Sequence, residues 1–354
     1  MNKNIIIMKR IVCTIMAVAA LAACTKSEVA YETPAEITFA PAAKNITKAA
    51  LAGTYPTSQK LGVYANYSND APSANALVGN YATKFLDNVT FSHNGTAWGA
   101  GESWPSNGSL IFAGYAIPKS GTPSGTYEYD FDSDKLTITN YTQSTNPAES
   151  FDLGWFNRTS ASYNYRNSAN TAVPVTLSHA LAWVEIQVKG EGTTIGTNPW
   201  KIKSMTINKV ANTGSAICVG AGVENAAWTP GTADQSITVF SGEQTLTENA
   251  VVCETANTDV LVIPQTPTEV LLADGKNLDV ANSIATLTVT YTYKSPAGED
   301  MPLQTATVPL IVDGGWKSGY KYTYTLTFKA SEILIAPKYD TWENATGVPP
   351  VTVE

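Results

Sequence analysis

Histidine and clustered cysteine, the usual ligands of structural metal ions, are almost missing from this sequence. It has two histidines, His93 and His179, and neither has a second histidine at a spacing that metal ligands use. The four cysteines form no CxxC pair and no Cys/His cluster. Patterns of the GxSxG, GxGxxG and P-loop types are also missing. We therefore expect no metal, no cofactor and no catalytic residues, and we do not expect an enzyme.

Basic residues are scarce, and they form no cluster. The chain has 22 lysines and arginines against 30 acidic residues, a net charge of −8. Nucleic-acid binding requires clustered positive charge to neutralise phosphates. The sequence thus predicts no nucleic-acid partner.

Long apolar runs are missing except near the N-terminus. Lys3, Lys9 and Arg10 precede an apolar run over 11–20, which is too short to span a bilayer and is typical of a signal peptide. The run ends in Leu-Ala-Ala before Cys24. Small residues before a cysteine are what lipoprotein processing requires, so residues 1–23 are predicted to be removed and Cys24 to carry the lipid. Several lipid chains on one residue would anchor the protein firmly to a membrane.

Helical periodicity is also missing, and strand periodicity takes its place. Residues 320–328 alternate between tyrosine, leucine or phenylalanine on one face and lysine or threonine on the other. Residues 286–293 and 179–189 alternate in the same way, as half-buried strands do. These segments and several shorter ones predict an all-β protein of β-sandwich type. The shorter candidates are 37–39, 61–67, 110–115, 136–138, 205–207, 237–240, 260–263 and 305–312.

Three features leave alternatives open. Cys218 and Cys253 either form a disulfide or remain two buried thiols. Asp130, Asp132 and Asp134 alternate as in a calcium loop but lack its glycine and distal glutamate, which favours a solvated turn. The eight tryptophans either stack on sugars or fill the cores of sandwiches, and core packing is the favoured interpretation.

A series of short motifs carries a resemblance to a known family. After Cys24 come Glu-Ile-Thr-Phe (36–39), Thr-Lys-Ala (47–49) and Gly-Val-Tyr-Ala (62–65), then Trp-Pro (104–105), LIFAGY (110–115), LSHALA (177–182) and WKSGYKYTY (316–324). In this order the motifs resemble the fimbrillin-like proteins, the lipoprotein precursors of type V pili.

The resemblance implies two transthyretin-like, Greek-key β-sandwich domains in tandem. With a boundary near 163–171, the expected division is a signal peptide (1–23), a lipidated segment with a removable strand (24–48), an N-terminal domain (49–172), a C-terminal domain (173–330) and a tail (331–354). Members of this family travel to the outer membrane as lipoproteins. Other fimbrial subunits are then expected as partners, with a receptor on a host or bacterial surface.

Assembly in this family implies loss of the N-terminal strand by proteolysis. Ile37 and Phe39 would be the apolar residues of the removable strand, and cleavage would fall between Lys48 and Ala49. Family members from oral bacteria are cut after arginine, and this mature chain has only Arg158 and Arg166. A protease that accepts lysine would act at Lys48, Lys44 or Lys60, or the subunit would stay uncleaved as an anchor or a tip.

The C-terminal tail is the expected donor of the replacement strand. Ile333 and Ile335 lie on one face, and Val351 and Val353 follow. The tail could instead close its own domain. The competing hypothesis for the whole protein is a surface glycan-binding lipoprotein of a nutrient-uptake system, which would need only a flexible tether after Cys24. A strand-forming segment at 37–39 favours the fimbrial subunit.

Overall fold

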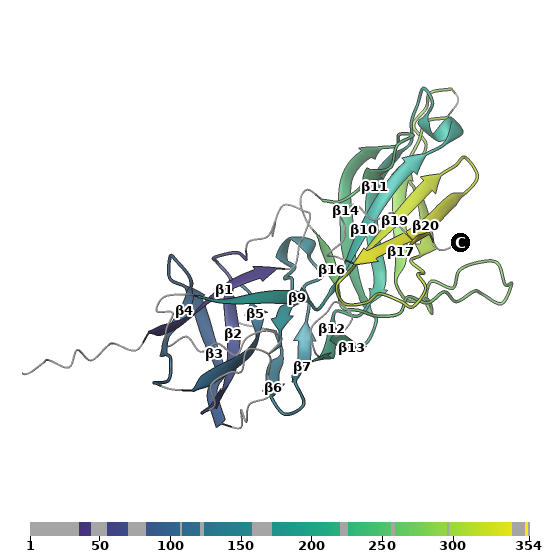
Figure 1. Ribbon diagram of the computed structural model, residues 1–354. Coiled ribbons are helices and arrows are strands. Elements are labelled where there is room, and N and C mark those ends of the chain that lie inside the picture. Colours follow the sequence, from purple (N-terminus) through teal and green to yellow (C-terminus); the bar gives the residue numbers. More distant parts are fainter. Residues whose placement is uncertain are drawn as a thin grey trace, which may run out of the picture. The chain divides into compact units, whose positions relative to one another are not determined.

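The computed structural model describes residues 35–43, 55–69, 83–106, 108–120, 124–157, 172–219, 226–255, 259–295, 297–341 and 351–352. All of them lie in one compact unit, Ala35–Glu354. Within these ranges the helices are two short 3-10 turns, η1 (Pro147–Glu149) and η3 (Gly192–Ile195), and the regular structure is otherwise strand (Figure 1). The predicted all-β class is confirmed.

The N-terminal strands form a closed barrel. Its order is β1-β4-β3-β2-β5-β8-β9. The strands are β1 (Glu36–Ala43), β2 (Lys60–Ser68), β3 (Thr83–His93), β4 (Trp98–Ser103), β5 (Ser109–Ile117), β8 (Gly154–Phe156) and β9 (Val173–His179). Every residue of β5 is buried, as its run of apolar and small residues would require.

Two further sheets enclose the C-terminal core. One has the order β15-β10-β19-β20-β21, with β16 also pairing with β10, and the other has the order β14-β11-β17-β18. Alternation in β19 places Tyr322, Tyr324 and Leu326 in the core between them. The strands are β10 (Ala182–Gly190), β11 (Lys201–Val210), β14 (Gln235–Thr245), β15 (Val251–Val252), β16 (Val260–Val262), β17 (Thr286–Thr292), β18 (Gln304–Pro309), β19 (Tyr320–Phe328), β20 (Ile333–Thr341) and β21 (Val351–Thr352).

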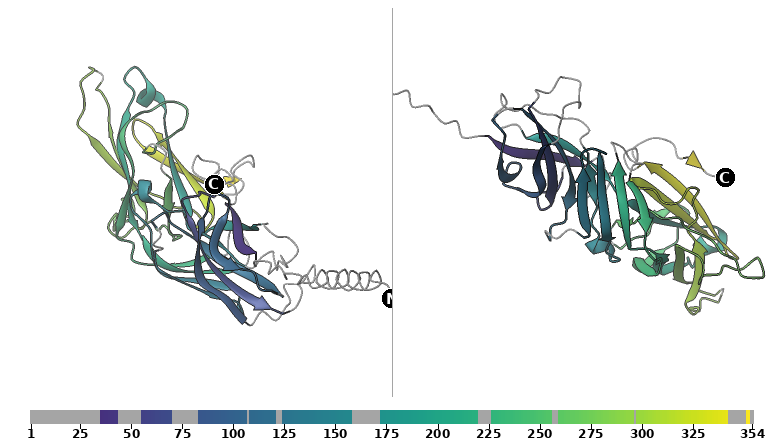
Figure 2. Two further views of the ribbon diagram at one scale, coloured as in Figure 1. Left: turned by 90° about the vertical axis from the view of Figure 1, so that its left-hand side faces the viewer. Right: turned by 90° about the horizontal axis from the view of Figure 1, so that it is seen from below.

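A fourth sheet joins strands that are far apart in the chain. Its order is β13-β12-β7-β6, with β6 (Thr126–Asp130), β7 (Lys135–Thr142), β12 (Thr213–Val219) and β13 (Ala226–Pro230) (Figure 2). A separate apolar cluster, containing Trp155, Trp183 and Cys218, lies against it. Pairing of β7 with β12 crosses the expected boundary at 172, and β9 joins the barrel although it follows that boundary. The division into two domains stays a prediction.

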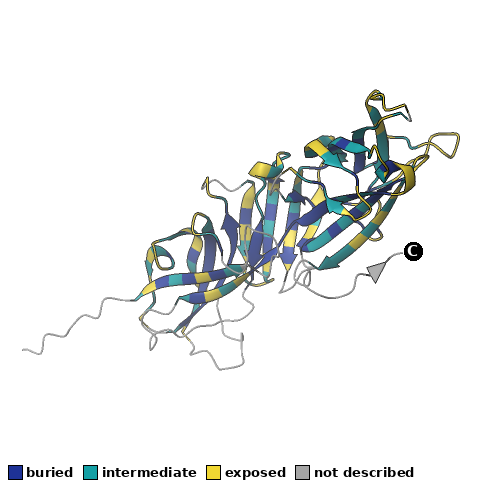
Figure 3. Ribbon diagram, turned by 90° about the horizontal axis from the view of Figure 1, so that it is seen from above, coloured by how far each residue is buried: buried dark blue, intermediate teal, exposed yellow. Residues whose placement is uncertain are grey.

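The regularity of burial along each strand explains why the sequence pattern predicts some strands and misses others. Buried residues lie along the strands, and exposed residues gather at the ends of hairpins (Figure 3). β3 was not predicted, because half-exposed and polar residues interrupt its apolar ones. β4, β6, β12 and β13 were not predicted either. In the described part of the chain no helix is long and apolar enough to cross a membrane.

Cys218 and Cys253 are both buried and both carry free thiols. Cys218 belongs to the cluster below the fourth sheet, whereas Cys253 belongs to the C-terminal core. Burial raises the pKa of both thiols, that of Cys253 to about 12. The structure therefore has the two buried thiols, not the disulfide, of the two alternatives.

Candidate functional site

β1 closes the barrel by pairing on both of its edges. On one side it runs antiparallel to β4, with Phe39 opposite Trp98. On the other side it runs parallel to β9, with Phe39 opposite Val173 and Ala43 opposite Leu177. In the ring of strands, β4 and β9 are joined only through β1. The strand predicted to be removable is thus the one whose loss would open the barrel between β4 and β9.

The inward face of β1 supplies the centre of the barrel core. Ile37 and Phe39 are each 0% exposed. The Phe39 ring meets Phe91 edge-on at 4.9 Å between centroids and Phe112 at 5.1 Å. Pro41, two residues further along the same face, is also buried. Full burial of a side chain of this size contributes about 1.5–3 kcal/mol, so removal of β1 would leave a large unfilled apolar slot.

Glu36 holds the start of β1 to β4. The backbone N–H of Gly101 donates a hydrogen bond of 2.9 Å to Glu36 Oε1. The same oxygen lies against Gly99, where an added Cβ would come within 2.5 Å of it. A larger residue at position 99 would require the Glu36 carboxylate to move. The strand therefore begins with an exposed, hydrogen-bonded carboxylate, which is followed by buried apolar positions.

Tyr55 anchors the chain on the far side of the predicted cleavage site. Lys44, Lys48 and Ala49 lie outside the described residues. The chain re-enters the barrel core at Tyr55, which is 2% exposed and donates a hydrogen bond of 2.8 Å to the Lys60 carbonyl. Its ring packs on Trp98 at 5.4 Å. Sequence analysis missed this residue; an isolated tyrosine next to proline carries no periodic signal.

Tail residues from Ile333 onward form β20, which pairs antiparallel with β19 of the same chain. Ile333 and Ile335 are half-buried and pack against the C-terminal core. The backbone of Val351 in β21 pairs with that of Tyr339 in β20, and Val353 lies outside the described residues. Cys24 also lies outside them. The described part of the tail therefore pairs with its own chain.

The remaining polar candidates are explained by local structure. Asp130 accepts hydrogen bonds from the Asp132 backbone N–H and the Ser133 hydroxyl, as a turn residue does. His179 is buried and lies 2.8 Å from Asp152, Nδ1 to Oδ2. Among the residues that the structure describes, no group of three or more His, Cys, Asp or Glu could hold a metal ion.

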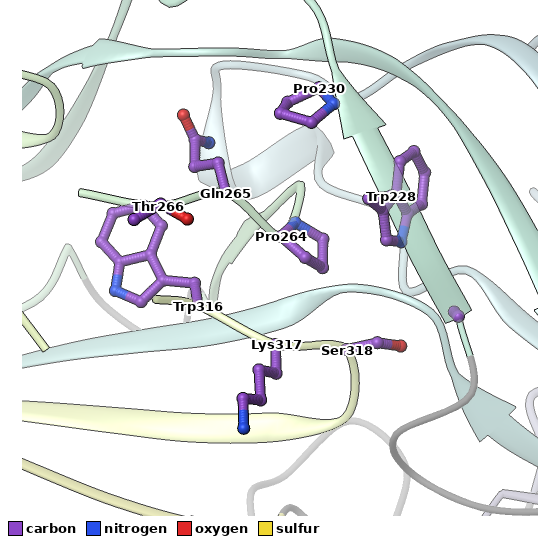
Figure 4. Close-up of a pocket in the computed structure, with 9 residues that line it drawn as sticks. Trp228, Pro230, Pro264, Gln265, Thr266, Trp316, Lys317 and Ser318 are labelled. Carbon is purple, nitrogen blue, oxygen red and sulfur yellow. The ribbon is translucent and has the colours of Figure 1, made fainter. Parts of the chain in front are cut away.

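A pocket of about 250 Å³ bears on the sugar-stacking interpretation of the tryptophans. Trp228 and Trp316 lie on opposite sides of Pro264 in the view of Figure 4. Their indole N–H groups donate to the Ala180 carbonyl and to the Tyr324 hydroxyl. The amide of Gln265, also in the wall, bonds to the backbone of Ala211. These polar groups serve the fold, which favours core packing for both tryptophans.

Comparison with known proteins agrees with the motifs. The fimbrillin-like family profile matches residues 47–342. A search of curated proteins gives no significant match. Because the matched range covers most of the chain but begins after β1, the resemblance found in the sequence is confirmed for the body of the protein.

The search of solved structures found similar chains from several bacteria. A Bacteroides ovatus protein assigned to cell adhesion is 14% identical, with 88% of this chain and 98% of that chain covered and a TM-score of 0.46. A Bacteroides uniformis protein assigned to cell adhesion is 15% identical, with 87% and 99% covered and a score of 0.42. The tip fimbrial protein Mfa3 of Porphyromonas gingivalis is 8% identical, with 88% and 100% covered and a score of 0.38. These scores are too low to add to the functional inference. On the strength of the family profile, this chain belongs to the fimbrillin-like family.

Proposed function

We propose that this chain is a structural subunit of a bacterial surface fimbria that serves cell adhesion. It is exported as a lipoprotein through Cys24 and held at the outer membrane. Cleavage after Lys48 releases β1, and the C-terminal strand of the next subunit then fills the slot between β4 and β9. Each subunit therefore donates at one end and accepts at the other, so the contact propagates a filament without closing. No step of this process requires a catalytic residue in the subunit.

The observation that carries the proposal is a sequence shared by β1 and the start of β20. Residues 36–41 read EITFAP and residues 332–337 read EILIAP. Both segments place apolar residues at the second and fourth positions and end in alanine and proline. Aligned in this way, Ile333 replaces Ile37, Ile335 replaces Phe39 and Pro337 replaces Pro41.

This alignment satisfies the slot position by position. Glu332 would take the place of Glu36, whose carboxylate accepts the hydrogen bond from Gly101. Because side chains alternate along a strand, Ile333 and Ile335 would then both face the core. A donor that enters in this register runs in the same direction as β1, parallel to β9 and antiparallel to β4.

The burial of the two strands supplies a driving force. Ile333 and Ile335 are only half-buried on their own sheet, whereas the residues they would replace are fully buried. Exchange gains apolar burial at both positions, at about 25 cal/mol per Å². It also requires β20 to leave β19, with which it pairs from Ile333 to Thr341. Separation of β20 from β19 is therefore expected to slow assembly.

The position of Lys60 argues against Lys60 as the cleaved residue and leaves Lys48, the proposed site, and Lys44. Lys60 begins β2, and its backbone pairs with Ile117 of β5. Proteases cut segments that are free of such pairing. A cut at Lys48 would also leave Tyr55 as an anchor in the barrel core.

The test is trace trypsin applied to the purified precursor without its lipid. Mass spectrometry identifies the new N-terminus, and light scattering follows particle size. We expect a single cut next to Lys48 followed by growth into rods, and Lys48→Ala should fold normally but remain a monomer. A stable monomer after cleavage of the unaltered chain would rule out self-assembly by strand exchange.

A further inference from the structure

The middle of the slot that β1 fills is built from aromatic rings. Phe39, at the fourth position of EITFAP, is 0% exposed. Its ring meets those of Phe91 and Phe112 edge-on, at 4.9 Å and 5.1 Å between centroids, and that of Phe156 lies at 6.4 Å. These three rings come from β3, β5 and β8, so they stay in the barrel when β1 leaves. A donor strand would therefore meet three aromatic rings at its fourth position.

The three rings are supported from behind. Trp104 meets Phe112 edge-on at 5.7 Å between centroids. The ring of Phe156 lies over Gly114 of β5, where an added Cβ would come within 2.8 Å of it. Phe91 is itself 0% exposed. Because rings that are packed on their far sides cannot move far, we expect the cavity at the fourth position to keep nearly the size of a phenylalanine ring.

The tail of this chain offers a smaller side chain at that position. In the alignment of EILIAP with EITFAP, Ile335 takes the place of Phe39. Isoleucine fills only part of a phenylalanine-sized cavity, and the unfilled part weakens the fit. It also has no ring, so the two edge-on contacts are lost, and such contacts add to the gain from burial alone. The chain's own donor strand is therefore a poor match for its own acceptor slot at the fourth position.

No other register of the tail corrects this mismatch. Residues 331–354 contain no phenylalanine, and their aromatic residues are Tyr339 and Trp342. Tyr339 at the fourth position would place its hydroxyl among three hydrocarbon rings. Trp342 at that position would bring Asp340 to the second position, where Ile37 is fully buried. A donor that fills the slot as β1 does must therefore come from another chain.

We infer that the slot selects donor strands by phenylalanine at the fourth position, and that its preferred partner is a different fimbrial subunit. The C-terminal strand of this partner carries an aliphatic residue at the second position and phenylalanine at the fourth. The inference rests on the proposed strand exchange, to which it adds the chemistry of the partner. Copies of this chain still join one another when no better donor is present, but a filament that contains both subunits changes from one to the other at this slot.

The test uses the full-length Ile335→Asp variant as the acceptor, because after trypsin treatment it is expected to have an open slot but no functional donor strand. A fluorescent peptide of residues 36–43 occupies the slot. It is displaced by an unlabelled peptide of residues 332–339 or by the same peptide with Ile335→Phe, and fluorescence polarisation measures each affinity. We expect Ile335→Phe to tighten binding about tenfold, because it restores the two edge-on contacts.

Two controls separate a fit at the fourth position from a general gain in apolar surface. The 332–339 peptide with Leu334→Phe adds the same ring to the opposite face of the strand, so its affinity should change less than about twofold. In the acceptor, Phe112→Leu removes one of the two edge-on partners and should reduce the preference for the Ile335→Phe peptide to about threefold. Far-UV circular dichroism checks that this acceptor variant folds.

The outcomes distinguish this inference from the proposed strand exchange. Equal affinity of the Ile335→Phe peptide and the unaltered 332–339 peptide, tighter binding of the unaltered one, or an equal gain from Leu334→Phe would overturn the inference and leave strand exchange intact. A full tenfold preference in the Phe112→Leu acceptor would also overturn it. Failure of every peptide to bind, including that of residues 36–43, would overturn strand exchange and this inference with it.

Assembly of the unaltered chain supplies a second readout. The same peptides are added while the trypsin-treated protein grows into rods, and light scattering follows the growth. The Ile335→Phe peptide should stop growth at a concentration about tenfold lower than the unaltered peptide does. Equal inhibitory concentrations of the two peptides would contradict selection at the fourth position.

Discussion

At the scale of single residues, Phe39 of β1 contacts three other aromatic rings. Its ring meets Phe91, Phe112 and Phe156, the last at 6.4 Å between centroids. These partners come from three other strands of the barrel. Two of these contacts, with Phe91 and Phe112, are edge-on, and all three depend on Phe39 remaining in place.

Phe39→Ala should lower the free energy of unfolding of the uncleaved protein by about 3–5 kcal/mol, because it leaves a cavity that the surrounding strands cannot close. Urea denaturation at neutral pH measures the change. Thr38→Ala, at a half-exposed position of the same strand, is the control and should cost less than about 0.5 kcal/mol. Similar losses for both variants would show that β1 does not anchor the barrel through Phe39.

Buried hydroxyl and thiol groups are expected to make the free energy of unfolding fall at alkaline pH. Burial raises the pKa of Tyr322 and Tyr324 above the ordinary tyrosine value and that of Cys253 to about 12. Tyr324 also accepts a hydrogen bond from the Trp316 indole and donates one to the Leu310 carbonyl. The folded state therefore favours the neutral form of each group.

Stability should be constant between about pH 6 and pH 8 and fall as the pH rises further. The thiol is ionised in the unfolded chain above about pH 8.5 and the phenols above about pH 10, while their folded pKa values are higher. Denaturation in guanidinium at neutral pH and at two alkaline values tests this expectation. Cys253→Ala should remove part of the fall that begins at the lower pH, and stability that rose with pH would contradict the assignment.

At the scale of elements, β1 and β20 have similar sequences in different surroundings. β1 pairs on both edges and its inward residues are fully buried. β20 has a long pairing on one edge, with β19, and its inward residues are half-buried. The same local pattern therefore forms a strand in both places, and only the neighbouring strands decide how deeply it is buried.

In the register proposed for exchange, one face of β20 enters the apolar slot of the barrel and the other face points away from it. Ile335→Asp should abolish rod growth after cleavage but leave the precursor folded, because a charge at this position would enter the apolar slot. Ile335→Phe should support rods at least as resistant to heat as the unaltered chain, since phenylalanine already fits there as Phe39. Electron microscopy and heat resistance of the rods provide the measurements.

Leu334→Asp is the matched control for this experiment. Leu334 is 43% exposed on its own sheet and would take the half-exposed place of Thr38 in the slot. Assembly should continue in this variant. Assembly blocked by Leu334→Asp and allowed by Ile335→Asp would place the donor one residue out of register, because such a shift exchanges the two faces of a strand.

At the scale of the whole molecule, the fourth sheet links parts that the sequence assigned to separate domains. Thr142 of β7 pairs with Thr213 of β12, and Lys135 pairs with Val219. The cluster below this sheet includes Tyr64 and Tyr115 of the barrel together with Trp183 and Leu261 from beyond it. Separation of the two parts would expose this cluster to water.

We therefore expect one cooperative unfolding transition for residues 35–354. Urea unfolding followed by far-UV circular dichroism should coincide with thiol exposure at Cys218 and at Cys253, which lie in different clusters. Ala216→Asp, at a buried position of β12, should lower both midpoints together. Ile217→Asp, at an exposed position of the same strand, should leave them unchanged. Distinct midpoints for the two thiols would show that the sheet does not couple the parts.

The sequence by itself determined the all-β class, many of the strands and the family. Strands such as 320–328 are visible because alternation has a period of two and depends only on adjacent residues. Residues 37–39 of β1 were predicted as a strand for the same reason, whereas the apolar role of Ile37 and Phe39 followed from the family resemblance. Interrupted strands such as β3 were missed, because their burial is uneven along the chain.

Tertiary structure decided which strands meet. The parallel pairing of β1 with β9, the joining of β7 to β12 and the anchoring of Tyr55 in the barrel all unite residues that are distant in the chain or carry no periodic signal. Pairing uses backbone N–H and C=O groups, which are the same for nearly every residue, so a sequence pattern shows that a strand forms but not which strand it joins.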